Sequence, residues 1–238
     1  MAKRRRSVNV PGQNALLAVL PDKELARLSS RLEPAAMSIK DVVYEPDGPI
    51  RQVYFPLSGV FSMLVVMEDG LAVEIGTIGN EGMVGMPVFL GTRTSPTRTI
   101  CQVPGEALRM RAEDLEEELG HDGALDDVLK RYNQALVTQM GYSVACNRLH
   151  SVEERMCRWL LMTHDRVGAD QFPLTQEFLA LMLGVRRPSV TVAAGVLQKA
   201  GLIAYARGRV VVLDRRGLEA ASCECYQRVK DEFERLLG

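Results

Sequence analysis

The sequence contains no apolar run long enough to cross a membrane and no internal repeat or low-complexity tract. Its apolar runs, such as 160–162 and 210–213, are far shorter than the roughly 18–20 residues that span a bilayer. The basic N-terminus MAKRRRSVNV is followed by no apolar segment, so we expect no secretory signal. These features predict a cytoplasmic protein without a membrane partner. Residues 1–13 are expected to form a basic tail, either a flexible solvated one or an arm that contacts a polyanion.

Cysteine and histidine are scarce and scattered. The five cysteines are odd in number and widely spaced, which indicates reduced thiols rather than a disulfide framework; they are Cys101, Cys146, Cys157, Cys223 and Cys225. The step from Cys223 to Cys225 would place these two thiols on different sides of a helix. An iron–sulfur centre needs about four clustered cysteines, and the three histidines, His121, His150 and His164, are far apart in the sequence. We therefore expect no metal site.

No arrangement typical of catalysis is apparent either. No Ser/His/Asp set or pair of convergent carboxylates stands out, and the carboxylates of Glu116, Glu117 and Glu118 would fan around a helix. The sequence therefore predicts a protein that is not an enzyme.

Charge is unevenly distributed along the chain. Residues 1–147 carry 15 lysines and arginines against 19 acidic residues, whereas residues 148–238 carry 14 against 11. The segment 186–216 holds one acid, Asp214, and seven basic residues: Arg186, Arg187, Lys199, Arg207, Arg209, Arg215 and Arg216. Such a local excess is what binding to a polyphosphate partner requires.

Three textures predict an α+β protein with an N-terminal antiparallel β-sandwich or barrel. Residues 14–33 are helical in pattern, with Pro21 and Asp22 starting a second short helix, and 36–110 alternate short β-rich runs with Gly and Pro turns. Asp69-Gly70 is a strong signal for a two-residue hairpin. A short helix follows at Ala112–Leu119. We expect one domain over 14–120, a connecting segment over 121–148 and a second domain over 149–238.

A long helix is predicted from about residue 124 to Asn147. One apolar stripe runs along it, formed by Leu125, Leu129, Tyr132, Leu136, Met140 and Val144. The stripe can pack on its own domain or against a second copy of the chain; we favour the second copy and expect a homodimer.

The C-terminal part contains a helix-turn-helix. Ser151 and Glu154 form a capping box before an apolar run that Gly168 ends. Thr175 caps a short helix over Gln176–Met182, Gly184 breaks it, and a second helix runs from about Arg187-Pro188 to Ala200. Leu181, Val185, Val190, Ala194 and Leu197 are expected to form the small core between the two helices.

A β-hairpin follows. The strands Leu202–Tyr205 and Arg209–Leu213 flank Ala206-Arg207-Gly208, which predicts the wing of a winged helix. Arginines at the start of the second helix and on the wing are suited to guanine edges and phosphates. Val192 would pack against a thymine methyl group or lie in the core. The candidate DNA-binding residues are Thr175, Gln176, Arg186, Arg187, Pro188, Ser189, Thr191, Val192, Arg207 and Arg209.

These motifs resemble the Crp/Fnr family of bacterial transcription regulators. The resemblance rests on VYFPLSGVFSMLV and IGNEGMVG in the N-terminal part, and on LTQEFLALMLGVRRPSVTVAAGVLQKAGLI and RGRVVVLD in the C-terminal part. It implies a cyclic-nucleotide-binding-like effector or sensor domain over 14–120, built as an antiparallel β-roll of the jelly-roll type. It also implies a dimerisation helix and hinge over 121–148 and a winged helix-turn-helix DNA-binding domain over 149–238. It also implies RNA polymerase as a partner.

The chain departs from the family's pattern at the effector pocket. Members that bind cyclic AMP carry a Gly-Glu pair that holds the ribose, whereas here Gly85 is followed by Met86. They also carry an Arg-Ser pair that holds the cyclic phosphate. An ungapped alignment places Thr97 and Arg98 at that pair, and only a shift of one residue places Arg98 and Thr99 there. Glu81 lies five residues too early to substitute. The candidate pocket residues are Glu81, Gly82, Gly85, Met86, Thr97, Arg98 and Thr99. We expect an effector other than cyclic AMP or none, and no haem or iron–sulfur ligand set.

The sequence thus predicts a homodimeric, sequence-specific DNA-binding transcription regulator that binds a near-palindromic duplex. One alternative is a small-molecule-binding module whose basic winged domain docks on a protein. Another is an enzyme housed in the roll.

Overall fold

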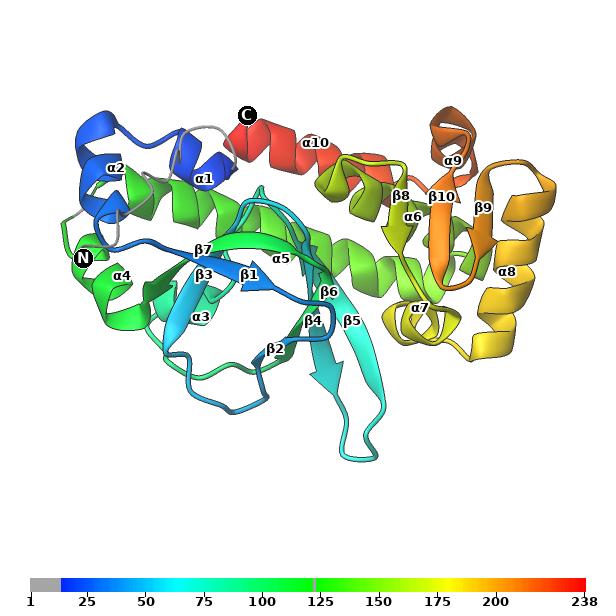
Figure 1. Ribbon diagram of the computed structural model, residues 1–238, viewed down its shortest axis with the longest axis horizontal. Coiled ribbons are helices and arrows are strands. Elements are labelled where there is room, and N and C mark those ends of the chain that lie inside the picture. The colour runs from blue at the N-terminus through cyan, green and yellow to red at the C-terminus, as the bar shows by residue number, and fades with distance from the viewer. Residues whose placement is uncertain (1–13, 122) are drawn as a thin grey trace, which may run out of the picture.

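The computed structural model describes residues 14–121 and 123–238, and the predicted basic tail, 1–13, lies outside them. Figure 1 shows a β-roll on one side, a winged helix-turn-helix on the other and a long helix behind both. The predicted α+β class with an antiparallel N-terminal roll is therefore confirmed.

The roll consists of two antiparallel sheets. One has the strand order β1-β7-β3 and the other the order β2-β6-β4-β5. The strands are β1 (Glu33–Met37), β2 (Val42–Tyr44), β3 (Gln52–Pro56), β4 (Val60–Val66), β5 (Ala72–Ile78), β6 (Arg98–Val103) and β7 (Gly105–Arg111). Their inward side chains, among them Val53, Phe55, Phe61 and Leu108, are at most 1% exposed and form the core of the roll.

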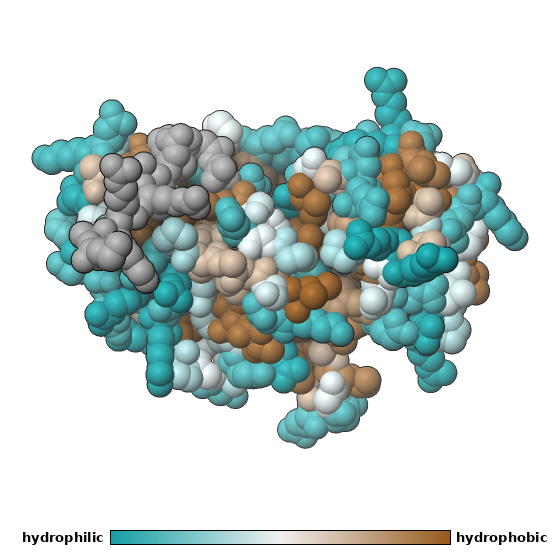
Figure 2. All heavy atoms as spheres, viewed as in Figure 1, coloured by the Kyte–Doolittle hydropathy of each residue, from teal (hydrophilic) through white to brown (hydrophobic). Residues whose placement is uncertain are grey.

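The hairpin between β4 and β5 has a longer loop than the predicted two residues. Met67 N donates to Leu71 O and Gly70 N donates to Met67 O, so three residues form the loop. Gly70 has a φ of 83°, as expected of the left-handed residue that ends such a loop. The loop projects from the body, with apolar and hydrophilic side chains side by side at its tip (Figures 1 and 2).

Short helices cover the roll. They are α1 (Ala15–Ala18), α2 (Asp22–Ser29), α3 (Met86–Phe89) and α4 (Ala112–Leu119). The predicted break near Pro21 is present, and the chain leaves the helical pattern at Ser29 rather than at residue 33. The side chain of Asn14 accepts from the backbone N–H groups of Leu16 and Leu17, which starts α1.

The long helix α5 spans Ala124–Leu149, and most of its apolar stripe packs on its own chain. Leu125, Leu129, Tyr132 and Leu136 are at most 3% exposed within the core of the roll, and Met140 is partly buried against it. The prediction that this stripe faces a second copy therefore needs correction, since only Val144 of the set is exposed, at 70%. Periodicity shows that a face is buried and not what buries it.

The C-terminal part begins with α6 (Val152–Val167), whose predicted capping box between Ser151 and Glu154 is present. It continues through the helices α7 (Gln176–Leu183), α8 (Arg187–Lys199), α9 (Arg215–Ala221) and α10 (Cys225–Leu237) and the strands β8 (Gln171–Pro173), β9 (Ile203–Ala206) and β10 (Arg209–Val212). The strands form a sheet in the order β8-β10-β9. The sequence analysis identified neither β8 nor the last two helices as separate elements.

The two halves of the chain contact one another directly. Trp159 Nε1 donates to Glu74 Oε1 at 2.9 Å, and the Arg166 guanidinium pairs with Glu81 at 2.8 Å. The last helix, α10, turns back along α5 toward α1 (Figure 1), and Phe233 meets the ring of Tyr132 edge-on. The C-terminal part is thus joined to the roll by α6 and by α10.

Within residues 14–121 and 123–238, no single helix is both long and apolar enough to cross a membrane.

Candidate nucleic-acid interface

The two helices of the helix-turn-helix, α7 and α8, cross at 104°, as expected for this motif. Gly184 ends α7 in the left-handed conformation with φ 60°, which a side chain would disfavour. The Thr175 side chain accepts from Phe178 N and caps α7. Arg186 is the extended residue before α8, and Pro188 lies in the first turn, where no N–H is needed.

The predicted core between the helices is present. Val190, Ala194 and Leu197 are at most 3% exposed, and Leu181 and Val185 are partly buried against them. Val192 is 64% exposed, which excludes the core from its two predicted roles.

The outer face of α8 carries most of the candidate contact residues. Arg186, Arg187, Pro188, Thr191 and Val192 are exposed, and Ser189 is half-buried. An exposed helix N-terminus with cationic side chains is electrostatically suited to phosphate. This face is therefore free to enter a groove of DNA.

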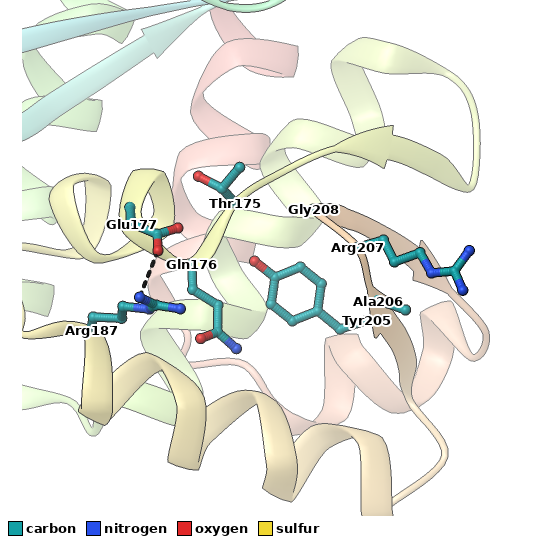
Figure 3. A pocket seen from close by; sticks show the side chains of 8 residues that line it. All are labelled: Thr175, Gln176, Glu177, Arg187, Tyr205, Ala206, Arg207 and Gly208. Carbon is teal, nitrogen blue, oxygen red and sulfur yellow. Dashed lines mark ion pairs between the residues drawn. The ribbon is translucent and has the colours of Figure 1, made fainter.

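Two contacts between α7 and α8 hold side chains at the start of that face. The Arg187 guanidinium pairs with Glu177 at 2.9 Å (Figure 3). Thr191 Oγ1 donates to Gln176 Oε1 at 2.9 Å. Arg187 and Glu177 are both more than 60% exposed, so the pair is solvated and weak, worth at most about 1 kcal/mol. Arg187 is thus oriented by Glu177 and can exchange it for a base or a phosphate.

The wing is the hairpin of β9 and β10, with Ala206 opposite Arg209 in the register. Its two-residue turn is Arg207-Gly208, with φ values of 51° and 73°, as in a type I′ turn. Arg207 is therefore a non-glycine residue in the left-handed region, which costs about 1–2 kcal/mol. The side chains of Arg207 and Arg209 are exposed, and Arg207 points outward in Figure 3.

A groove of about 320 Å³ lies between α7, the start of α8 and the wing. Three of the predicted DNA-binding residues line this groove: Thr175, Gln176 and Arg207 (Figure 3). Tyr205, which was not among the predicted residues, lines it too. The Tyr205 hydroxyl is buried with no hydrogen-bond partner among the described residues, and burial raises its pKa to about 12. Because this oxygen is shielded from solvent, Tyr205 forms part of the groove wall and not a contact for phosphate. The signal in the sequence that could have identified Tyr205 is its place in the first wing strand, two residues after the buried Ile203.

Not all basic residues of 186–216 belong to this surface. Arg215 pairs with Asp165 at 2.6 Å and with Glu219 at 3.0 Å, and it donates to the Tyr226 hydroxyl. Its role is to bind α9 to α6 and α10.

Several of the candidate effector-pocket residues contact other parts of the chain rather than one another. Glu81 pairs with Arg166, Gly82 packs against the Tyr132 ring, and Arg98 pairs with exposed Glu45 at 2.8 Å. The remaining positions are Gly85, at φ 112° before α3, buried Met86, half-buried Thr97 and buried Thr99.

The expectation that the chain has no ligand set for a metal was wrong. Cys146, His150, Cys223 and Cys225 place their ligand atoms within 4.8 Å of one another. Cys223 precedes α10 and Cys225 is its first residue, so the two thiols are not fixed on opposite sides of one helix. Cys146 and His150, four residues apart at the end of α5, share one face; that spacing was the signal in the sequence.

Comparison with known proteins identifies both halves of the molecule. A model of the cyclic nucleotide-binding domain matches residues 37–122, and a model of the Crp-like helix-turn-helix domain matches residues 154–221. Together they take up more than half of the chain and define a DNA-binding transcription regulator with a sensor-type roll. The chain belongs to the Crp/Fnr family.

Solved structures agree on the fold. FixK2 from Bradyrhizobium japonicum is 15% identical with a TM-score of 0.69, covering 81% of this chain and 98% of its own. The c-di-GMP-responsive regulator CLP from Xanthomonas campestris is 17% identical with a TM-score of 0.65, covering 82% and 100%. A CooA variant from Carboxydothermus hydrogenoformans is 14% identical with a TM-score of 0.61, covering 90% and 97%. No curated protein matches the sequence.

Proposed function

We propose that this protein is a homodimeric, sequence-specific DNA-binding transcription regulator. The observation that carries the proposal is the joint exposure of the α8 face, with Arg187, Thr191 and Val192, and of the wing arginines Arg207 and Arg209. Base readout requires short polar and cationic groups on a helix that fits the major groove, and positioning requires cations that reach the phosphates beside it. Both are found on adjacent elements.

The contact residues divide into two roles. Arg187, in the first turn of α8, donates two hydrogen bonds to O6 and N7 of a guanine, and exposed Val192 packs against a thymine methyl group. Arg207 and Arg209 bind phosphates and set the register. The Arg187–Glu177 pair orients the guanidinium before DNA arrives.

The dimer is proposed to form through the solvent face of α5 rather than through the buried stripe. Gln134, Val137, Gly141 and Val144 are exposed at steps of three, four and three, the spacing of a coiled-coil seam. Nothing lies within 4 Å of where a Gly141 side chain would begin, so two helices could approach closely there. Pairing would set two α8 helices about 34 Å apart, one turn of DNA, on a near-palindrome.

Control by an effector other than cyclic AMP, or by none, fits the roll. Arg98 is engaged by Glu45 at the surface, and position 86 offers a thioether, which cannot bind ribose hydroxyls as a carboxylate does. A cavity of about 220 Å³ between the roll, α6 and α10, lined by Glu81, Arg166 and Tyr226, would let a small molecule shift the DNA-binding part between two positions. RNA polymerase is the proposed protein partner.

Selection of random duplex DNA by the purified chain tests the proposal. We expect an enriched near-palindrome whose binding weakens steeply with salt. Arg187→Ala should relax that preference at one base, while Arg109→Ala, which removes a similarly paired arginine from the roll, should leave it unchanged. Binding that ignores sequence, or no binding with and without added metabolite extract, would favour a winged domain that docks on a protein.

A further inference from the structure

Three cysteines and one histidine converge where α5, α6 and α10 meet. Cys146 lies in the last turn of α5 and His150 directly follows that helix. Cys223 lies between α9 and α10, and Cys225 begins α10. Segments more than 70 residues apart in the sequence thus present four donors to one point. No part of the proposed DNA interface uses them.

Two of the donor separations match the edges of a tetrahedron around one ion, and all four ligand atoms lie within 4.8 Å of one another. The Sγ atoms of Cys146 and Cys223 are 3.5 Å apart, and Cys225 Sγ lies 3.7 Å from His150 Nδ1. Zinc bonds of about 2.3 Å to sulfur and about 2.0–2.1 Å to nitrogen place tetrahedral ligands roughly 3.5–3.8 Å apart. We propose that Cys146, His150, Cys223 and Cys225 bind one zinc(II) ion.

Burial shows which type of zinc site this would be. The three cysteines are at most 4% exposed, and the His150 side chain is 16% exposed. Four protein ligands and no open position are typical of a structural zinc site, whereas a catalytic one keeps a position for water. The ion would clip α10 to the end of α5.

The histidine is oriented as a ligand. Its Nε2 lies 3.3 Å from Glu224 Oε2, while Nδ1 faces the thiol of Cys225. A carboxylate that accepts the outer N–H of a histidine leaves the other nitrogen unprotonated and raises its basicity, as at many zinc centres. Glu224 separates the two cysteines in the sequence, so the CEC segment would supply two ligands and one supporting group.

Two buried arginines supply an independent reason for negative charge at this place. Arg155 and Arg158 are 7% and 8% exposed, and within the described part of the chain the Nε atom of each has no hydrogen-bond partner. Arg158 acts electrostatically on Cys146 and Cys225, and Arg155 on Cys146 and Cys223. Three thiolates around zinc carry a net charge of about −1, which such cations stabilise.

Hydrogen bonds of Arg155 connect the surroundings of the cluster to the end of α7. Arg155 donates to Asn147 Oδ1 at 2.8 Å, next to Cys146, and also to Leu183 O at the end of α7. Cations that bind the last carbonyls of a helix stabilise its end. Both family models leave the cluster out, since they match 37–122 and 154–221. The zinc proposal does not depend on the proposed function.

Metal analysis of the full chain, purified under reducing conditions, tests the proposal. We expect about one zinc per chain. Cys223→Ala and Cys225→Ala should each lose most of it, whereas Cys101→Ala, which removes an equally buried thiol from β6, should retain it. Equal zinc content in all three variants, or none in the unsubstituted chain, would overturn the assignment.

Cobalt substitution keeps the test valid if the cysteine variants do not fold. The zinc-free chain should take up cobalt(II) with the intense visible bands of a tetrahedral site and a thiolate charge-transfer band. Three thiols should become reactive when a chelator removes the metal. An iron–sulfur chromophore, a disulfide between Cys146 and Cys223, or reduced thiols that bind neither ion would each contradict the proposal.

Discussion

Trp159 Nε1 donates a 2.9 Å hydrogen bond to Glu74 Oε1, and this contact fixes α6 of the DNA-binding part against β5 of the roll. The other carboxylate oxygen of Glu74 is also buried. Burial raises the pKa of Glu74 to about 7, and the hydroxyl of Ser62, the charge of Arg158 and the Trp159 hydrogen bond counteract it only in part. The junction between the two halves therefore contains a carboxyl group that titrates near neutral pH.

Stability should consequently fall between about pH 4.5 and pH 7 because of Glu74. The folded chain holds this proton more tightly than the unfolded chain, so the contribution is complete below the unfolded pKa and is lost as pH rises through the folded one. The shift corresponds to roughly 3 kcal/mol. Glu74→Gln should remove this component in denaturant titrations at several pH values. The same slope in Glu74→Gln as in the unsubstituted chain, or an equal change in Glu68→Gln on the exposed loop, would refute the assignment.

Replacing Arg207, which adopts a left-handed backbone conformation, should raise stability and lower DNA affinity. Arg207→Asn creates the Asn-Gly turn that a type I′ hairpin prefers, so the free energy of unfolding should rise by about 0.5–1 kcal/mol. The same change removes a phosphate-binding cation, so DNA affinity should fall similarly for all sequences and the salt dependence should flatten. Denaturant unfolding and fluorescence anisotropy measure the two effects. Arg209→Asn, in the strand, should weaken binding without stabilising the fold; unchanged affinity in Arg207→Asn would remove Arg207 from the interface.

Arg187 and Glu177 should affect DNA binding in opposite directions. Arg187→Ala should cost about 1–3 kcal/mol on the preferred site and relax the choice of one base. Glu177→Gln removes the carboxylate that competes with DNA for Arg187 and should strengthen binding. Competition assays with singly substituted duplexes measure both. If Arg187→Ala weakens every duplex equally, Arg187 binds phosphate and not a base.

Local patterns predicted the elements whose signals lie within a few neighbouring residues. The capping box at Ser151, the left-handed Gly184 and the proline at the start of α8 each determine a boundary from adjacent residues, and all are present. The helix-turn-helix was therefore predicted almost residue by residue. The three-residue loop at Gly70 differed because the flanking strands, and not the Asp-Gly pair alone, set loop length.

Features made by distant segments escaped the same analysis. Cys146 and Cys223 lie 77 residues apart, and only the return of α10 along α5 brings them together. The α5 stripe was predicted as a helix face correctly, but α10 and the roll cover it. Sequence periodicity is the same whether the apolar partner belongs to the same chain or to another.

The solvent face of α5 provides the last prediction. Val137→Glu with Val144→Glu would place four carboxylates in the seam of a dimer, where like charges repel and are desolvated. Neither side chain belongs to the core, because they are 50% and 70% exposed, so the fold should survive. We expect a monomer in sedimentation experiments, with far weaker binding to a palindrome and nearly unchanged binding to a half-site. The matched control is Val19→Glu with Val42→Glu, two valines of the roll that are each 51% exposed. A dimer that persists in the α5 variant would exclude this face and leave the β4–β5 loop, with exposed Met67 and Leu71, as the next surface to test.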